Sequence, residues 1–533
     1  METVESAIPQ SDSRFGWSYD YVALTLLTAI ASVAALLFYY HRDAILLYGD
    51  AVAHINIARR VFDSRTPGFF QLGTVWLPLP HALDVPFITN DWLWRSGIGA
   101  SIPSMLAYVV GTLGVFRLVR GLASRTAAWI AALMYALNPN PLYMQATAMT
   151  EALYLACFVW TAVYFSEFAR QAKDDPLQAR RSLERCALVL AAAMLVRYDA
   201  WFLAAVVAIG VIGVFWRQKD AAVALRRGVI NFLVLTALVP GLWLAYNHAA
   251  YGNALEFANG PYSARAIQER TRTATMPSYP GEGSPRTAAL YMLKVSRLNL
   301  AEGRTEYLLL TAAFIAFLSA LYFARKFLPW TLLWTPLLFY TICLAWGSVP
   351  IYQPEWWPFS YYNVRYGLQL LPAVAVFVAL GYELLSKLVS PRIVAAAAAI
   401  IVVASYASLW MRAPICLREA VANGKQRMQF DRQLAEEFQK FPASAALMMD
   451  CGAHPGAVQM AGIPFRRVLR ESNPPYWEIA LTEPARSADF VIAITGDDVS
   501  RAVRLFPEHL APVATVGTPP GPRAVLYHST LRR

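Results

Sequence analysis

Two side chains able to do acid–base chemistry follow the first long apolar stretch of the sequence. In "LLYGDAVAHINIARR", Asp50 begins a segment whose apolar residues recur at helical spacing, and His54 follows one turn later. A carboxylate held at the start of a helix can accept a proton from a hydroxyl nucleophile. The alternative is that Asp50 only caps the helix, since aspartate is among the best N-caps. The two roles are compatible.

A second carboxylate stands at the start of a later apolar stretch. Glu151 opens "EALYL", where it could simply complement the helix dipole, with Thr150 as the cap. Together with Asp50 it would give a pair suited either to acid–base work or to holding a divalent cation. Because a base must come within reach of the reacting centre, we expect Asp50 to lie within about ten ångströms of Glu151 or Arg365.

Two arginines lie beside apolar segments, where ionisable groups are costly and usually line a cavity or a pathway. Arg197 has Asp199 two residues away and could be paired with it. Arg365 has no acidic neighbour in the sequence and is flanked by tyrosines that include Tyr362 and Tyr366. A guanidinium fork fits two phosphate oxygens, so Arg365 is the first candidate and Arg197 the second for binding a phosphate. Asp199, Tyr362 and Tyr366 are then candidates for a substrate pocket.

The stretch "GTVWLPLPHALDVPF" adds Trp76 and His81 as candidates for lining a sugar or lipid pocket. The alternative is that its aromatic residues only anchor the chain at a membrane interface. Pro78, Pro80 and Pro86 argue against a continuous helix in this stretch.

These residues must be positioned by a membrane protein. The chain has 533 residues, of which 57% are hydrophobic and only 15% charged, a balance outside the range of ordinary soluble domains. A span needs about 20 largely apolar residues. We expect about eleven spans, near 21–40, 97–118, 126–138, 151–168, 186–196, 201–216, 228–249, 306–324, 328–346, 367–386 and 393–411.

The basic residues indicate how the chain is oriented. Lysines and arginines gather in short loops on alternate sides of the spans, and the positive-inside rule places those loops in the cytoplasm. The N-terminal segment 1–20 would then be cytoplasmic, 21–411 would form the membrane domain, and 420–533 would lie outside. The last region alternates short apolar runs with helical patterns, which predicts a small α/β domain. We expect a helix over 51–64 to lie along the outer membrane surface.

Three further features limit the function. The net charge of +11 belongs to the loops, which excludes nucleic acid as a partner. The polar N-terminus lacks the pattern of a cleaved signal peptide, so the first span is expected to remain as an anchor. Of the five cysteines, only Cys416 and Cys451 lie where a pairing is plausible, and the stretch 275–286 reads as a mobile loop.

Taken in order, these motifs resemble the GT-C superfamily of membrane glycosyltransferases, and particularly glycosyltransferase family 39, which contains protein O-mannosyltransferases and bacterial lipid A aminoarabinose transferases. The resemblance covers most of the chain. It rests on "YGDAVAHINIARRVFDS", "GTVWLPLPH", "TEALYL", "RYDAWF", "YGNALEF" and "NVRYGLQLLP".

The resemblance implies a mainly α, polytopic helix bundle in a bacterial plasma (inner) membrane. It would transfer a sugar of the hexose type from a polyprenyl-phosphate carrier to a hydroxyl of a lipid, glycan or protein on the extracytoplasmic face. Asp50 takes the position of the carboxylate that activates the acceptor, and Arg365 that of the phosphate-binding arginine. The sequence departs from protein O-mannosyltransferases, because Gly49 and Ala51 flank Asp50 where those proteins have an Asp-Glu pair. A polytopic transporter or flippase for a lipid-linked or anionic substrate is the alternative, since intramembrane charges also mark transport pathways.

Overall fold

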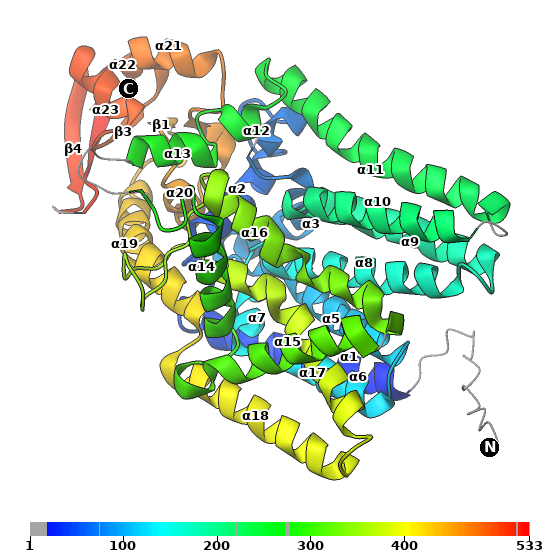
Figure 1. Cartoon of the computed structure of the whole chain (residues 1–533). Coiled ribbons are helices and arrows are strands. Elements are labelled where there is room, and N and C mark those ends of the chain that lie inside the picture. Colours follow the sequence, from blue (N-terminus) through cyan, green and yellow to red (C-terminus); the bar gives the residue numbers. More distant parts are fainter. Residues whose placement is uncertain are drawn as a thin grey trace, which may run out of the picture.

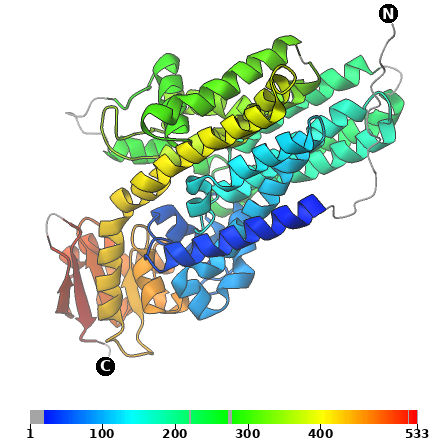
Figure 2. The same cartoon turned by 90° about the horizontal axis from the view of Figure 1, so that it is seen from below.

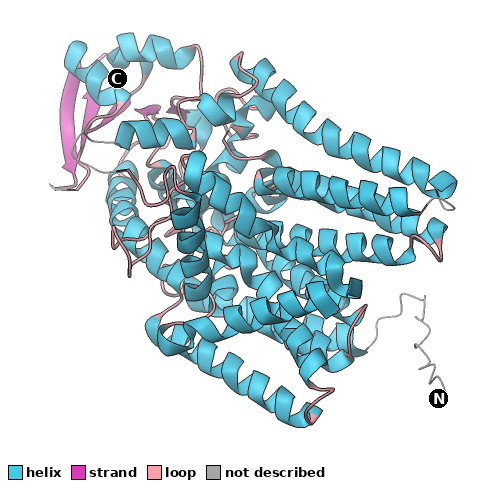
Figure 3. Cartoon of the chain, in the orientation of Figure 1, coloured by secondary structure: helices cyan, strands magenta, loops and turns pink. Residues whose placement is uncertain are grey.

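A bundle of apolar helices is joined to a small α/β domain in a computed structural model of the chain (Figure 1). The structure describes residues 19–73, 75–218, 222–271, 278–323, 325–518 and 521–531. Helices dominate, and the strands are confined to one corner of the molecule (Figure 3). The predicted fold class, a polytopic helix bundle with a C-terminal α/β domain, is thereby confirmed. The predicted cytoplasmic segment 1–20 lies almost wholly outside the described residues, as does part of the loop expected over 275–286.

The bundle is built from long helices rich in alanine, leucine and valine. Its elements are α1 (Tyr19–Tyr40), α5 (Ile98–Arg120), α6 (Arg125–Ala136), α8 (Glu151–Gln171), α9 (Pro176–Met194), α10 (Asp199–Arg217), α11 (Ala222–Tyr251), α15 (Glu306–Phe323), η4 (Arg325–Trp334), α16 (Thr335–Trp346), η5 (Val364–Leu370), α17 (Leu371–Leu385) and α18 (Pro391–Arg412).

Eight helical segments of the described chain are long and apolar enough to cross a membrane, judged by length and composition. They are α1, α5, α8, α10, most of α11, most of η4 with α16, η5 with α17, and α18 with the helix that follows it. Helix α15 is a shorter apolar helix. The segments expected at 126–138 and 186–196 correspond to α6, which has 12 residues, and α9, which begins within a basic stretch. The count of eleven therefore stays a prediction, while the chain is plainly a multi-pass membrane protein.

Shorter helices connect the long ones at the end of the bundle nearest the α/β domain. These are α2 (Gly49–Arg60), η1 (Phe69–Leu72), α3 (Pro78–Ile88), α4 (Asp91–Ser96), α7 (Pro139–Met144), α12 (Glu256–Asn259), α13 (Ala264–Thr271), α14 (Pro285–Leu298) and η3 (Gly303–Thr305).

Helix α3 corrects the expectation that three prolines would prevent a continuous helix there. Pro78 is its first residue and Pro80 its third. The N–H groups in the first turn of a helix have no acceptor within the helix, so proline loses no hydrogen bond at these positions. Pro86 lies near the other end, in the last turn. The proline content therefore marks where α3 begins and does not break it.

Helix α2 occupies the predicted position, at Gly49–Arg60 instead of 51–64. Eight of its 12 residues are buried, and it packs against α3 and against α20 (Pro455–Ala461) of the C-terminal domain. Its charged residue Arg59 is buried too, with ion pairs to Asp63 at 3.0 Å and Asp91 at 2.8 Å. The rest of the chain therefore buries α2 more completely than we expected for a helix lying along the membrane surface.

The C-terminal domain has a five-stranded sheet in the order β2-β1-β3-β5-β4. Strands β1, β2 and β3 are parallel, whereas β5 pairs antiparallel with β3 and with β4. Its other elements are β1 (Leu447–Met449), η6 (Phe465–Arg467), β2 (Val468–Leu469), α21 (Tyr476–Thr482), α22 (Pro484–Ser487), β3 (Phe490–Ile494), α23 (Asp498–Leu505), β4 (Leu510–Val516) and β5 (Ala524–Ser529). The apolar runs expected to form strands correspond to β1, β3 and β5.

A long helix, α19 (Ile415–Phe438), joins the bundle to the sheet, as Figure 2 shows in gold. A Cβ atom at Gly424 would collide with the backbone carbonyl of Leu47, so only glycine lets α19 approach the segment before α2 this closely. Arg427 reinforces the contact through a 2.7 Å hydrogen bond from Nη2 to the carbonyl of Leu46. The domain boundary expected at 420 falls inside this helix.

The structure shows no disulfide between the two cysteines considered for pairing. Cys416 and Cys451 are both free and buried. The Cys416 thiol donates to Asn299 Oδ1 at 3.3 Å, and the Cys451 thiol lies 3.7 Å from the carbonyl of Met449. Each therefore serves as a small packing residue in its own environment.

Candidate active site

A cavity of about 1410 Å³ lies between the helix bundle and the C-terminal domain. Its walls come from α2, from the segments around η1, α13 and η5, and from the loops after β1 and β2. Five of the residues predicted from the sequence line it: Asp50, Trp76, Tyr362, Arg365 and Tyr366. Cavities of this kind, with mostly apolar walls and a few convergent polar groups, are where ligand sites usually occur.

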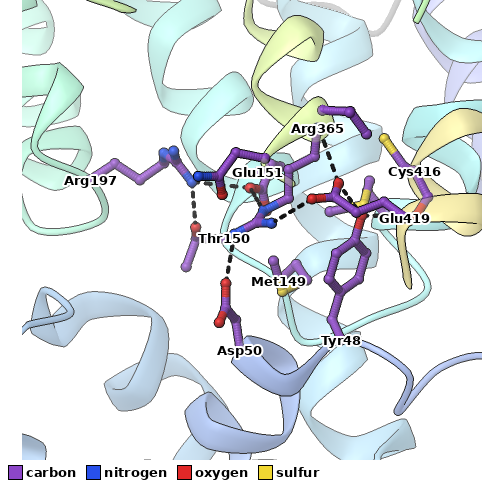
Figure 4. A network of polar contacts seen from close by, with 12 residues as sticks. Tyr48, Asp50, Met149, Thr150, Glu151, Arg197, Arg365, Cys416 and Glu419 are labelled. Carbon is purple, nitrogen blue, oxygen red and sulfur yellow. Dashed lines mark hydrogen bonds and ion pairs between the residues drawn. The ribbon is translucent and has the colours of Figure 1, made fainter. Parts of the chain in front are cut away.

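Asp50 lies in the first turn of α2 but does not cap it. The N-cap position is Tyr48, which makes no side-chain capping bond, and Asp50 follows two residues later. Its carboxylate instead points across the cavity wall to Arg365, with Oδ2 2.6 Å from Nη2 (Figure 4). The Asp50 side chain is 38% exposed, so a ligand in the cavity can reach it. The expected proximity of Asp50 and Arg365 is confirmed.

Arg365 is surrounded by three carboxylates. Besides Asp50, its Nε donates to Glu151 Oε1 at 3.2 Å, and its Nη1 lies 3.3 Å from Glu419 Oε1 (Figure 4). These partners come from α8 and α19, and Arg365 itself lies in η5 at the start of a candidate span. The expectation that Arg365 lacks an acidic partner holds only along the sequence, because the fold brings all three partners from distant segments. The guanidinium nevertheless lies on the cavity wall.

Glu151 links the two arginines that were singled out from the sequence. Its Oε1 accepts from Arg365 Nε at 3.2 Å and from Arg197 Nη1 at 3.1 Å, and its side chain is 1% exposed. Thr150 occupies the N-cap position of α8 as expected but makes no side-chain capping bond, and its hydroxyl instead accepts from the same Arg197 nitrogen at 3.1 Å. A carboxylate held this deeply between two cations is better placed to orient them than to take a proton from a substrate.

Arg197 and Asp199 form a closed set of contacts with Tyr340. Arg197 Nε lies 3.2 Å from Asp199 Oδ1, its Nη2 donates to the Tyr340 hydroxyl at 2.9 Å, and that hydroxyl donates to Asp199 Oδ2 at 2.8 Å. Neither Arg197 nor Asp199 is among the described residues that line the cavity. The fold therefore brings them near the site as support for Glu151, and not into the substrate pocket that was expected for Asp199.

His54 and His81 are placed together, away from the cavity. His54 Nδ1 lies 2.8 Å from His81 Nε2, and both side chains are buried. Burial lowers the pKa of His54 to about 4 and lowers the pKa of His81 well below its ordinary value. Both rings are therefore neutral at pH 7. They pack under Trp76, whose ring lies 4.8 Å from that of His54, and so support the cavity wall.

Aromatic rings line the same side of the cavity as Arg365. Tyr366 stacks on Tyr340, with 4.8 Å between the ring centroids. The guanidinium carbon of Arg365 lies 5.3 Å from the centroid of the Tyr366 ring. Tyr362 is 40% exposed, and burial of the rest of its ring raises its pKa above the ordinary value. Together with Trp76 these rings provide flat surfaces of the kind that stack on sugars.

Glu419 is the residue of this cluster that sequence reasoning missed. One oxygen pairs with the Arg365 guanidinium, and the other accepts from the Arg365 backbone amide at 3.3 Å and from the Tyr48 hydroxyl at 2.9 Å. Its position after the last apolar span, in a stretch that reads as an exterior linker, gave it no distinguishing mark. A useful sign would have been a single acidic residue within the first turns of a long helix that leaves the membrane.

The cluster holds more negative than positive charge. Asp50, Glu151 and Glu419 face Arg365, and only Arg197 adds a second cation. In the described part of the chain no group of three or more His, Cys, Asp or Glu side chains is arranged to hold a metal ion. The Arg365 guanidinium occupies the space between Asp50 and Glu151 where a divalent cation had been considered. Glu151 Oε2 has no hydrogen-bond partner among the described residues.

Part of the chain matches a known family by sequence. Residues 94–243 match the family model described as dolichyl-phosphate-mannose-protein mannosyltransferase. This region runs from α4 to α11 and includes Glu151 and Arg197, but neither Asp50 nor Arg365. No curated protein matches the chain by sequence.

Solved structures match the fold over nearly the whole chain. ArnT from Cupriavidus metallidurans bound to undecaprenyl phosphate superposes with a TM-score of 0.59, at 13% identity, covering 96% of this chain and 98% of ArnT. The oligosaccharyltransferase of Archaeoglobus fulgidus gives a TM-score of 0.50 at 10% identity, covering 89% of this chain and 70% of that one. The same enzyme tethered to an acceptor peptide with the NVT sequon gives 0.50 at 13% identity, over 96% of this chain and 74% of that one. The resemblance to the GT-C superfamily is confirmed at the level of the fold.

Proposed function

We propose that the chain is a membrane glycosyltransferase that takes a sugar from a polyprenyl-phosphate carrier and attaches it to a hydroxyl of an acceptor. The observation that carries the proposal is the direct pairing of Asp50 with Arg365 on the wall of a large cavity. A base and a phosphate-binding cation are the two groups that this transfer needs most, since the sugar already carries a good leaving group. The undecaprenyl phosphate bound to ArnT, which shares the fold, supports a lipid-phosphate donor.

In the proposed reaction the donor phosphate binds Arg365. Its oxygens compete with Asp50 for Nη2, and the Asp50 carboxylate is released toward the acceptor. Asp50 takes the proton of the acceptor hydroxyl as the oxygen bonds to the anomeric carbon of the sugar. The bond between that carbon and the phosphate oxygen breaks, and its electron pair leaves with the polyprenyl phosphate. Arg365 stabilises the charge that develops on this leaving group.

The carboxylates behind Arg365 would act as positioning residues. Glu151 and Glu419 contact the guanidinium from α8 and α19, and neither is among the described residues that line the cavity, so they fix its plane and do not reach a substrate. A guanidinium held this way loses little freedom when it binds phosphate. The acceptor, a lipid, a glycan or a protein, would enter beside Asp50. We place the site on the extracytoplasmic side of a bacterial inner membrane, because the basic loops are predicted to face the cytoplasm.

The proposal can be tested with the purified full-length protein in lipid nanodiscs. Polyprenyl phosphate carrying a radiolabelled sugar is supplied as donor, a detergent extract of membranes from cells that lack the protein is supplied as the source of acceptor, and loss of label from the intact donor is followed over time by thin-layer chromatography. We expect the label to leave the donor at a rate that falls when Asp50 is changed to Asn. A transporter would leave the sugar on its lipid, so unchanged labelled lipid with every donor sugar tested, despite tight donor binding, would favour that alternative.

A further inference from the structure

The C-terminal domain presents one particular edge of its sheet to the cavity. The cavity is lined by Cys451 and Gly452, which follow β1, and by Arg470, Glu471 and Ser472, which follow β2. These strands are parallel neighbours, so both loops extend from the carboxyl ends of their strands. Open α/β sheets bind their ligands in the crevice outside those ends. The domain is therefore oriented with its binding edge toward the candidate active site.

Two arginines, Arg60 and Arg470, line the cavity at this edge. Arg60, at the end of α2, donates from Nε to the carbonyl of Gln71 at 2.9 Å, and Arg470 Nη2 reaches Gln71 Oε1 at only 3.4 Å. Neither guanidinium forms an ion pair with a described carboxylate, and Arg470 Nε has no hydrogen-bond partner among the described residues. Arg470 is 1% exposed, so its charge is buried on the cavity wall.

The two guanidinium groups lie close enough to repel each other. Burial, and then the Arg470 charge, lower the pKa of Arg60 to about 10. Glu471 lies nearby and partly offsets the repulsion, but its Oε2 is already held by the Cys451 amide at 2.9 Å. Arg470 also stacks over the Phe465 ring, with its guanidinium carbon 4.9 Å from the ring centroid, but its buried Nε stays without a hydrogen-bond acceptor among the described residues. Burying a guanidinium that lacks an ion-pair partner is costly, so an anionic ligand in the cavity would stabilise it.

The distance from the catalytic pair follows from helix geometry. Asp50 and Arg60 lie on the same helix and are ten residues apart, which at 1.5 Å per residue separates them by about 15 Å along the axis. Both line one continuous cavity. A ligand that reaches Arg60 and Arg470 while its hydroxyl lies beside Asp50 must therefore be an extended molecule, with its anionic group well removed from that hydroxyl.

We propose that Arg60 and Arg470 form a subsite for an anionic group of the acceptor, a phosphate or a carboxylate, and that the C-terminal domain is the part of the protein that selects the acceptor. This inference rests on the proposed function, because it assigns the acceptor to that reaction. Gln71 positions the two guanidinium groups through its backbone and side-chain oxygens. The donor phosphate at Arg365 and the acceptor anion at Arg60 would occupy opposite ends of the cavity.

The test uses the full-length protein in nanodiscs saturated with undecaprenyl phosphate, so that the donor end of the cavity is filled. Binding of inorganic phosphate is measured by ³¹P NMR line broadening, and sodium glucuronate is tested as a competitor. We expect the wild type to bind phosphate and Arg60→Gln to bind it about tenfold more weakly or worse, because a charge-assisted contact is lost. Arg486→Gln is the matched control, since Arg486 is an exposed arginine of the same domain whose carboxylate partner is Glu483.

A second variant covers the possibility that Arg470, being buried, is needed for folding. Arg470→Lys keeps the charge but not the fork, and we expect it to retain the thermal midpoint while losing most phosphate affinity. Tighter binding of glucuronate than of phosphate would identify a carboxylated acceptor. Tighter binding of phosphate than of glucuronate would identify a phosphorylated acceptor. Equal phosphate binding by the wild type, Arg60→Gln and Arg470→Lys would overturn the subsite. Failure of the proposed function is read separately, as failure of undecaprenyl phosphate to bind or of the labelled sugar to leave its lipid.

Discussion

Glu419 holds Arg365 by two different groups at once. One carboxylate oxygen lies 3.3 Å from the guanidinium nitrogen Nη1, and the other lies 3.3 Å from the backbone amide of the same residue. The second oxygen also accepts a hydrogen bond from the Tyr48 hydroxyl. The Glu419 carboxylate therefore joins three segments: α19, which carries it, η5, which carries Arg365, and the segment before α2. The position of Arg365 is thus set from outside its own span.

Changing Glu419 to Gln should therefore disturb the site even though Glu419 is not among the described residues that line the cavity. The amide keeps the shape but removes a buried charge, and we expect a loss of about 1–3 kcal/mol in unfolding free energy. The donor KM should rise, since Arg365 loses one of its supports. Glu436→Gln, on the exposed face of the same helix, is the control. A donor KM equal to that of the wild type would show that Glu419 stabilises the fold without positioning Arg365.

Replacing Asp50 by Asn tests the proposed base. Asparagine can still accept a hydrogen bond from Arg365 but cannot take a proton, so we expect transfer to fall by about 10²–10⁴-fold while expression stays at the wild-type level. Asp91→Asn is the comparison, because Asp91 pairs with Arg59 on the same segment and its side chain is 75% exposed. Transfer by Asp50→Asn at the wild-type rate would leave Asp50 as no more than a partner of Arg365.

Arg365→Lys tests phosphate recognition with the charge retained. A lysine ammonium can satisfy at most part of the contacts that the fork makes with Asp50, Glu151 and Glu419. We expect activity and undecaprenyl phosphate affinity to fall together, by about tenfold or more. Donor affinity is measured directly by titration into nanodiscs. If it were unchanged, the phosphate would have to be bound elsewhere, and Arg197 would be the next residue to examine.

Asp450 gives the C-terminal domain a predictable dependence on pH. Burial, and then the charge of Glu471, raise the pKa of Asp450 from 3.8 to about 6. The folded state therefore favours the protonated form, and the associated stability is present below pH 3.8 and is lost as the pH rises through about 6. Asp450→Asn should raise the thermal midpoint at pH 8 and leave it nearly unchanged at pH 4. The amide oxygen can still accept the 2.9 Å hydrogen bond from Gly452.

Much of the fold could be predicted because it depends on local composition. Long apolar stretches specify membrane helices regardless of what surrounds them, and the alternation of short apolar runs predicted three of the five strands. The other two strands, β2 and β4, were not predicted, for different reasons. Strand β2 has only two residues, and β4 has mostly half-buried and exposed positions without a clear apolar pattern.

The site was predictable only in part, because its defining contacts join distant segments. Asp50 and Arg365 could each be selected from their neighbours in the sequence, yet they are 315 residues apart and no local pattern shows that they touch. Arg365 has no acidic neighbour in the sequence, and no local pattern shows the three carboxylates that the fold brings to it. His54 seemed poised for catalysis because it lies one turn from Asp50, but α3 packs against α2 and brings His81 to the His54 ring in the interior. Burial of this kind depends on which elements pack on α2.

Helix α19 has a consequence for anyone who exchanges parts between relatives of this protein. A chimaera joined directly after the last apolar span would discard Glu419 together with Gly424 and Arg427, which fit against the segment leading into α2. The recipient bundle would then receive a foreign domain and lose the residues that hold Arg365 in place. A junction placed after Phe438 keeps those residues with the bundle, so exchange of the C-terminal domain would leave the surroundings of Arg365 intact.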